Sequence, residues 1–186
     1  MQTAGLCTRA VIPPLIEDGD LAIRALQDTA GDSVILAKWL TDPRVLEFYE
    51  GRDNPFPIDR IQEKYAPRVL GSENVVPCLL IFQGAPIAYA QFYPIPEEDG
   101  VYGIDQFIGE AGLWNRGLGT RAVVLLLQYL FRAKGARKVT VDPHVANARA
   151  IRCYEKCGFR KVQLLPRHEL HEGALRDSWL MEAALQ

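Results

Sequence analysis

Apolar and polar positions follow two periods along the chain, and the changes of period divide it into strands and helices. Apolar runs bounded by glycine, proline or acidic turns predict strands. We expect seven of these, over residues 21–26, 75–82, 85–95, 101–108, 138–142, 159–168 and 175–183. Helical spacing predicts a helix and a second short helix within 32–49, separated by Pro43, and a helix through 61–65 that Asp59 could cap.

The most apolar segment of the chain predicts a long helix over residues 118–133. Its apolar residues fall on nearly every face, so we expect this helix to be buried between layers. Gly135 would end it, and Gly158 would end a further helix over 146–157. A strand, this helix and a strand joined by short links predict a parallel strand pair, and hence an α/β fold with a mixed sheet.

The first eighteen residues differ from the rest of the chain. They contain Pro13 and Pro14 and end on an acidic stretch, which predicts an N-terminal arm over 1–18 that need not be ordered. Residues 19–186 show no internal repeat and no linker. We therefore expect a single domain there.

Composition excludes several functions. The chain has 186 residues, 48% hydrophobic and 24% charged, with a net charge of −2. It has no overall basic field for nucleic acid. No apolar run is long enough to cross a membrane, and no secretory signal is visible. Four cysteines without a C-x-x-C pair indicate reduced thiols and a cytoplasmic protein.

No metal site is expected from the sequence. Cys153 and Cys157 share a helix face, but no further ligands stand at a recognisable spacing. The segment His168–His171 is not H-E-x-x-H, and it falls in a predicted strand.

Two glycines stand at the start of the long helix, in the stretch Asn115-Arg116-Gly117-Leu118-Gly119-Thr120. Backbone N–H groups at a helix N-terminus bind anions, and glycine lets a phosphate approach the backbone closely. Arg116 could add charge there. The alternative is a plain turn in which Gly119 packs the helix closely on the sheet.

The second notable stretch is DPHVANARAIRCYEKCGF, residues 142–159. Asn147 could cap the helix or bind a ligand. Tyr154, taken alone, is typical of an amphipathic core position with a solvated hydroxyl.

Together the two stretches resemble the coenzyme A-binding core of the GCN5-related N-acetyltransferase (GNAT) superfamily, from about Val75 to the end. The resemblance implies a mostly antiparallel sheet of about seven strands flanked by helices, with a splayed parallel pair that holds acetyl-CoA. Trp114 departs from the family, which often has glutamine or arginine there. The implied cofactor-binding residues are Phe107, Ile108, Asn115, Arg116, Gly117, Leu118, Gly119, Thr120, Asn147, Ala150 and Tyr154.

A narrower resemblance links the chain to the aminoglycoside 6′-N-acetyltransferases. It is carried by GRDNPFPIDRIQEKYAPRVLG (51–71), Pro77-Cys78, PIAYAQFY (86–93) and GIDQ (103–106). It implies direct acetyl transfer to the 6′-amine of an aminoglycoside, hence antibiotic resistance. Segment 160–178 is longer than in known members and the turn at 97–100 is shorter, and both border the acceptor pocket. The alternatives are another amine (a siderophore hydroxylamine or lysine-like precursor, a polyamine, a protein N-terminus) and a non-catalytic acyl-CoA-binding module.

Acetyl transfer needs an acceptor for the amine proton and a donor for the leaving sulfur. Asp105 stands in an otherwise apolar strand, where a carboxylate is costly unless paired or functional. The resemblance gives it the first role and gives Tyr154 the second. We expect a small cationic amine as substrate, and a monomer or homodimer. The candidate substrate-binding residues are Phe48, Tyr49, Glu73, Asp99, Asp105, Asp142 and Asp177.

Overall fold

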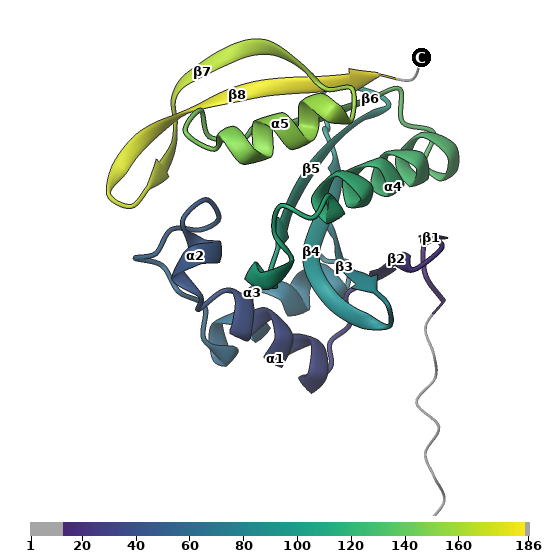
Figure 1. The fold of residues 1–186 in the computed structure, drawn as a ribbon, viewed down its shortest axis with the longest axis vertical. Coiled ribbons are helices and arrows are strands. Elements are labelled where there is room, and N and C mark those ends of the chain that lie inside the picture. The colour runs from purple at the N-terminus through teal and green to yellow at the C-terminus, as the bar shows by residue number, and fades with distance from the viewer. Residues whose placement is uncertain (1–12, 185–186) are drawn as a thin grey trace, which may run out of the picture.

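The computed structural model describes residues 13–184 of the chain. These residues contain eight strands and five α-helices (Figure 1). The strands are β1 Ile16–Asp18, β2 Leu21–Ala25, β3 Val76–Phe82, β4 Ala85–Pro94, β5 Val101–Ile108, β6 Lys138–Val141, β7 Arg160–His171 and β8 Ala174–Ala184. The helices are α1 Ala30–Trp39, α2 Pro43–Leu46, α3 Ile58–Val69, α4 Leu118–Ala133 and α5 Ala148–Lys156, with the short 3-10 helix η1 Ala111–Leu113.

All eight strands belong to one sheet, in the order β1-β2-β3-β4-β5-β6-β8-β7. Among residues 13–184, β5 and β6 are the one parallel pair of neighbours, and the other pairs are antiparallel. The predicted mixed and mostly antiparallel sheet with a parallel pair is confirmed. The strand that the prediction lacks is β1, which pairs with β2 from Ile16 to Asp18, inside the segment predicted as an arm. The rest of that prediction falls largely on residues 1–12, outside the described residues.

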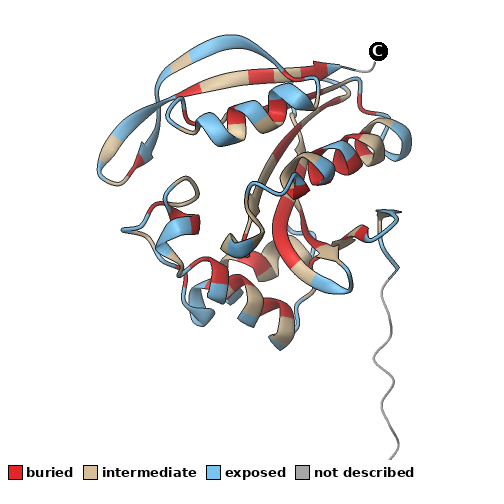
Figure 2. Ribbon diagram, viewed as in Figure 1, coloured by how far each residue is buried: buried red, intermediate tan, exposed pale blue. Residues whose placement is uncertain are grey.

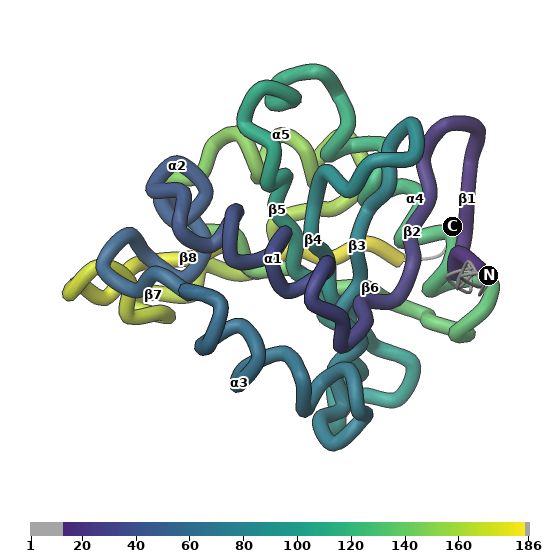
Figure 3. Tube along the Cα trace, turned by 90° about the horizontal axis from the view of Figure 1, so that it is seen from below, coloured from purple at the N-terminus to yellow at the C-terminus, as the bar shows by residue number. Residues whose placement is uncertain are grey.

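The sheet has a hydrophobic core on each face. Alternate residues of β3 point to opposite sides, so Cys78 and Leu80 join one core while Leu79 joins the other. The first core contains α4 and α5, and the second contains α1, α2 and α3. Figures 1 and 3 show the two groups of helices on opposite sides of the central strands. The result is a three-layer arrangement around one sheet.

Helix α4 lies on the outside of this arrangement, so the prediction that it is buried between two layers is wrong. Its inner side is buried, but Arg121, Val124 and Arg132 form an exposed stripe at helical spacing (Figure 2). Val124 made this stripe hard to recognise, because an exposed valine looks like a core position. Asp59 is also not a cap: α3 begins after Pro57, which makes no side-chain capping bond.

The parallel strands β5 and β6 separate because each follows a different antiparallel neighbour. Their pairing ends at Gly103 and Thr140, while β5 continues along β4 to Ile108. After β6 ends at Val141, the chain follows β8 instead: the backbone N–H of Val145 donates to Asp177, and that of Trp179 donates to Pro143 (2.9 and 3.0 Å). The sheet therefore opens beyond Gly103, and the N-termini of α4 and α5 face the opening.

The N-terminal half is anchored by a buried ion pair. The guanidinium of Arg24 in β2 donates two hydrogen bonds of 2.7 and 2.6 Å to the carboxylate of Asp32 in α1. Asp32 is buried and also accepts from the backbone N–H of Gln27. This pair joins α1 to the sheet.

We expect Asp32→Ala to lower the free energy of unfolding by about 3 kcal/mol, because it leaves Arg24 with an uncompensated charge. The control is Asp20→Ala, which breaks the ion pair with Arg121, where both side chains are about two-fifths exposed. That change should cost much less than Asp32→Ala, because an exposed ion pair contributes little to stability. Urea denaturation measures both, and equal losses would contradict the assignment.

Candidate active site

The opening between β5 and α5 is a cleft of about 290 Å³. Residues from β5, the turn into α4, α5 and the α2 region line it. Of the predicted cofactor-binding residues, the cleft is lined by Phe107, Ile108, Asn115, Gly117, Leu118, Gly119, Thr120, Asn147, Ala150 and Tyr154. Phe48 and Tyr49 line it too. Arg116 is exposed and does not line the cleft, so its predicted contact stays a prediction.

The two glycines have different roles. Gly117 is the N-cap of α4 and has φ +78°, a conformation that side chains rarely adopt. No side chain caps this helix, so its first N–H groups face the cleft. A Cβ on Gly119 would meet only cleft-lining atoms at ordinary distances, the nearest being Cys153 Sγ at 3.6 Å. Close packing on the sheet therefore does not explain why residue 119 is a glycine. The close approach of a ligand is the explanation that is left.

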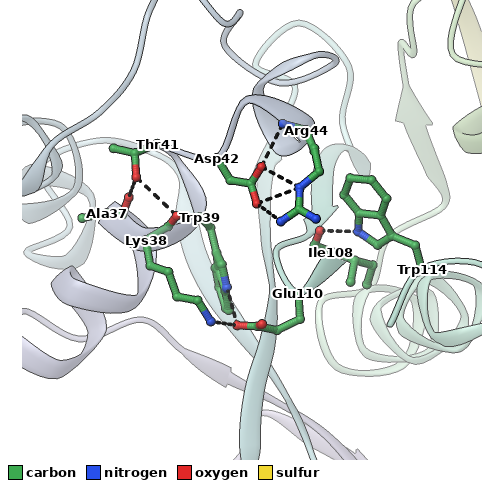
Figure 4. A network of polar contacts seen from close by, with 9 residues as sticks. All are labelled: Ala37, Lys38, Trp39, Thr41, Asp42, Arg44, Ile108, Glu110 and Trp114. Atoms are coloured by element: carbon green, nitrogen blue, oxygen red, sulfur yellow. Dashed lines mark hydrogen bonds and ion pairs between the residues drawn. The ribbon is translucent and has the colours of Figure 1, made fainter. Parts of the chain in front are cut away.

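Four cations line the cleft that sequence reasoning missed: Arg44, Arg149, Arg152 and Lys156. Asp42 holds the Arg44 guanidinium through hydrogen bonds of 3.0 and 2.6 Å (Figure 4). The guanidinium of Arg149 lies 4.1 Å from the centre of the Trp114 ring. Together with the N-terminus of α4, these charges make this end of the cleft suited to a polyanion.

Trp114, which departs from the family pattern, has a structural role. Its indole N–H donates to the carbonyl of Ile108 at 2.8 Å (Figure 4). Its ring packs against the guanidinium of Arg149. In the same loop, Glu110 accepts from the indole of Trp39 at 2.9 Å and from Lys38. These bonds hold the connection between β5 and α4 against α1.

Helix α5 brings three functional groups to the cleft. Asn147 caps the helix by accepting from the N–H of Ala150 at 3.1 Å. Tyr154 is buried, and the loss of solvent together with the charge of Asp105 raises the pKa of its phenol well above the usual value. Hydrogen bonds from Cys157 and Thr120 lower the pKa of the Cys153 thiol. At neutral pH the phenol of Tyr154 is therefore protonated.

Asp105 lies on β5 just before the cleft-lining residues. Loss of solvent raises the pKa of its carboxyl to about 6, and the nearby charges of Asp142 and Glu169 add to the rise. The amide of Gln91 opposes it by donating to Asp105 at 2.7 Å. Gln91 is itself fixed, because its carbonyl accepts from Tyr89 and Arg68 at 2.7 and 2.9 Å. Asp105 is thus an oriented carboxylate that gains or loses a proton near neutral pH.

The remaining candidate substrate-binding residues do not all lie near Asp105. Asp142 lies close enough to raise the pKa of Asp105, and it pairs with His168 at 2.8 Å. Glu73 binds Arg68 at 2.8 Å. Asp177 accepts from the N–H of Arg167 at 2.8 Å, and the exposed Asp99 pairs with Arg137. None of these four lines the cleft, so their contact with a substrate stays a prediction.

Comparison with known proteins places this cleft in a family. A sequence profile for the acetyltransferase (GNAT) domain matches residues 28–166, about three quarters of the chain. The chain belongs to the GNAT acetyltransferase family. It is 36% identical over 143 residues to an aminoglycoside N(6′)-acetyltransferase type 1 from Klebsiella pneumoniae, a match that covers 72% of this chain and 71% of the relative. It is also 45% identical over 64 residues to a kanamycin resistance protein from Rhizobium radiobacter, covering 34% of this chain and 59% of the relative.

Solved structures of acetyltransferases also resemble this chain. The aminoglycoside acetyltransferase AAC(6′)-Ib in complex with coenzyme A has a TM-score of 0.75 and 32% identity, covering 88% of this chain and 94% of that one. The same enzyme with coenzyme A and kanamycin has a TM-score of 0.74. A spermidine N-acetyltransferase from Vibrio cholerae shares the fold at 18% identity, with a TM-score of 0.77 over 89% of this chain and 95% of that one. No helix among residues 13–184 is long and apolar enough to cross a membrane.

The environment of Asp105 makes a prediction about its ionisation. Gln91→Leu removes the hydrogen bond that lowers the pKa of Asp105, so that pKa should rise above about 6. Because the pKa of Asp105 in the folded protein lies above its ordinary value of 3.8, ionising Asp105 costs stability as the pH rises from about 4 to about 6, and the variant should deepen this loss. Carboxyl carbon NMR during a pH titration measures the pKa. Gln128→Leu on α4 is the control and should leave it unchanged; an unshifted pKa in Gln91→Leu would refute the assignment.

Proposed function

We propose that this protein acetylates the 6′-amine of aminoglycosides with acetyl-CoA as the donor. One observation carries the proposal: an anion-binding helix N-terminus and a buried phenol line one cleft, and an oriented carboxylate lies on β5 directly before the residues that line it. The aminoglycoside acetyltransferases named above, one of them solved with coenzyme A and kanamycin, support the choice of donor and acceptor.

The cleft fits coenzyme A by its charge and its shape. The N–H groups of α4 at Gly117 to Gly119 and the guanidinium of Arg149 would hold the pyrophosphate. At Gly117 no heavy atom outside its immediate chain neighbours lies within 4 Å of the position that a Cβ would take, so a phosphate could approach the backbone there. Bound there, acetyl-CoA supplies an acetyl thioester to the open end of β5. Backbone N–H groups near Phe107 and Ile108, which line the cleft, would donate to the thioester oxygen.

Two side chains would manage the protons. Asp105 accepts a proton from the attacking amine as the C–N bond forms, and its pKa of about 6 places it near the pH at which it must work. Tyr154 donates its phenolic proton to the departing sulfur as the C–S bond breaks. Its raised pKa keeps the phenol protonated until then. The protein therefore gains one proton at Asp105 and gives up one from Tyr154, and the products are an amide and a thiol.

The acceptor would lie beside Asp105, Phe48 and Tyr49. Asp142 and Glu169 bring further negative charge to this side, since the charge of each raises the pKa of Asp105. A polycationic amine is attracted most strongly where water is excluded. A cytoplasmic location, a monomer or homodimer, and the absence of nucleic-acid binding remain predictions.

Thiol release from acetyl-CoA tests the reaction. We expect fast turnover with kanamycin and tobramycin and slow turnover with a gentamicin component methylated at the 6′-amine. Asp105→Asn should lower kcat at least about 100-fold while the affinity for acetyl-CoA stays near that of the wild type. Tight acetyl-CoA binding without turnover on aminoglycosides, but with turnover on spermidine or a lysine analogue, would replace the acceptor and keep the chemistry.

A glycine variant tests the cofactor site separately. Gly119→Val should weaken acetyl-CoA binding at least about 10-fold, because its side chain would project among cleft-lining atoms, with little change in Tm. Gly117→Val is a poorer test, since φ +78° would strain the backbone whether or not a ligand binds. Calorimetry with acetyl-CoA measures the affinity, with Gly112→Ala as the control at a position with open space. Unchanged affinity in Gly119→Val would remove this cofactor site.

A further inference from the structure

Two buried histidines and a glutamate meet outside the cleft. His144 lies in the loop after β6, and Glu169 and His171 lie near the end of β7. One ligand atom from each of the three side chains lies within 4.8 Å of the other two. The two imidazoles are perpendicular, with ring centres 4.7 Å apart. None of the three takes part in the proton transfers proposed above, although Glu169 adds negative charge near Asp105.

The burial of His171 is unusual for its strand. β7 is an edge strand and is exposed over most of its length, as Figure 2 shows. His171 is its one buried residue and is only 5% exposed. Glu169 is two residues earlier, so it lies on the same side of the strand, and His168 lies on the other. The strand therefore turns one imidazole and one carboxylate toward His144.

The hydrogen bond of His171 leaves a nitrogen free to bind a metal. Its Nε2 lies 2.9 Å from the backbone carbonyl of Glu47. A carbonyl only accepts, so Nε2 is the nitrogen that donates in this contact, and Nδ1 is the nitrogen that a metal could reach. Metal-binding histidines typically donate their second N–H to a carbonyl or carboxylate in this way.

The other two members are also suited to a cation. Nε2 of His144 lies 2.8 Å from a carboxylate oxygen of Glu169, so an imidazole and a carboxylate already meet here. Ser178 forms a β-bridge with His144, which places both side chains on the same side. Ser178 is fully buried, and its hydroxyl has no hydrogen-bond partner among residues 13–184. A metal-bound water would give it one.

We propose that His144, Glu169 and His171 bind a divalent transition-metal ion, with Zn²⁺ as the best match to two imidazoles and a carboxylate. Bonds of about 2.0–2.1 Å in a tetrahedral site place ligand atoms about 3.3 Å apart, so small movements from the present arrangement, in which the three ligand atoms lie within 4.8 Å of one another, would complete the site. Glu169 can supply the movement because its side chain is 53% exposed. Three protein ligands leave one position for water.

The site joins two segments beside the acceptor. His144 belongs to the loop that follows β6, and His171 is bonded to the α2 region through Glu47. Glu169 is near enough to Asp105 to influence its pKa. A bound cation would therefore hold the β7–β8 hairpin in place at the acceptor side.

The test is metal binding by the whole chain after treatment with a chelator, without donor or acceptor. Its failure would leave the proposed function untouched. We expect one equivalent of Zn²⁺ to bind saturably and to raise Tm by about 5 °C in excess metal. Co²⁺ should bind with visible d–d absorption and without the near-ultraviolet band of thiolate ligation, which would instead indicate Cys153 and Cys157.

The chain provides matched variants, since its three histidines are His144, His168 and His171. His144→Gln and His171→Gln should each weaken Zn²⁺ binding at least about 10-fold, and His168→Gln should not. Glu169→Gln covers the case in which a buried histidine variant unfolds, because Glu169 is exposed. Circular dichroism in chelator verifies each fold. Absence of saturable binding, a thiolate band, or equal binding by wild type and Glu169→Gln would overturn the proposal.

Discussion

The separation of β5 from β6 is the constraint on which the rest of the site depends. Two parallel strands normally share hydrogen bonds along their length, but here each leaves the other for an antiparallel partner. The opening would expose unpaired backbone groups, which cost free energy unless they find partners. Part of the cost is offset by side chains, such as the Trp114 indole on the carbonyl of Ile108. The remaining groups are available to a ligand, so the opening creates the cleft.

The charges around this opening give it a direction. Cations and a helix N-terminus gather at the turn into α4, whereas Asp105, Asp142 and Glu169 gather where β5 meets the hairpin. A ligand with phosphates at one end and a cationic partner at the other can bind in one orientation only. Gln91 fixes the orientation of the Asp105 carboxylate at the acidic end, because Tyr89 and Arg68 hold the Gln91 amide with its N–H groups toward Asp105.

The strands, most of the helices and the glycine turn could be predicted from sequence, because local patterns determine them. Alternation in β3 and the apolar run of α4 are examples. Long-range placement could not be predicted in the same way. Arg44, Arg149 and Lys156 look like ordinary surface residues of helices, and only the packing of α2 and α5 against β5 brings them to one cleft. Asp99 and Asp177 show a second difficulty, since nothing in a sequence distinguishes a surface carboxylate from one that faces a substrate.

Regular secondary structure positions the residues proposed for the transfer chemistry, whereas contacts between distant segments shape the region proposed to choose the acceptor. Asp105 and the cleft-lining end of β5 are positioned by sheet hydrogen bonds, and Tyr154 by a capped helix, so their geometry follows from regular structure. The proposed acceptor side would be bounded by the loop after α2 and by the tip of the β7–β8 hairpin, and the contacts between these two segments depend on side chains. Arg52 binds Glu172 at 2.6 Å, and His171 binds the carbonyl of Glu47. Such contacts form and break at lower cost than a strand ladder, so this boundary can adapt to different amines while the transfer chemistry stays the same.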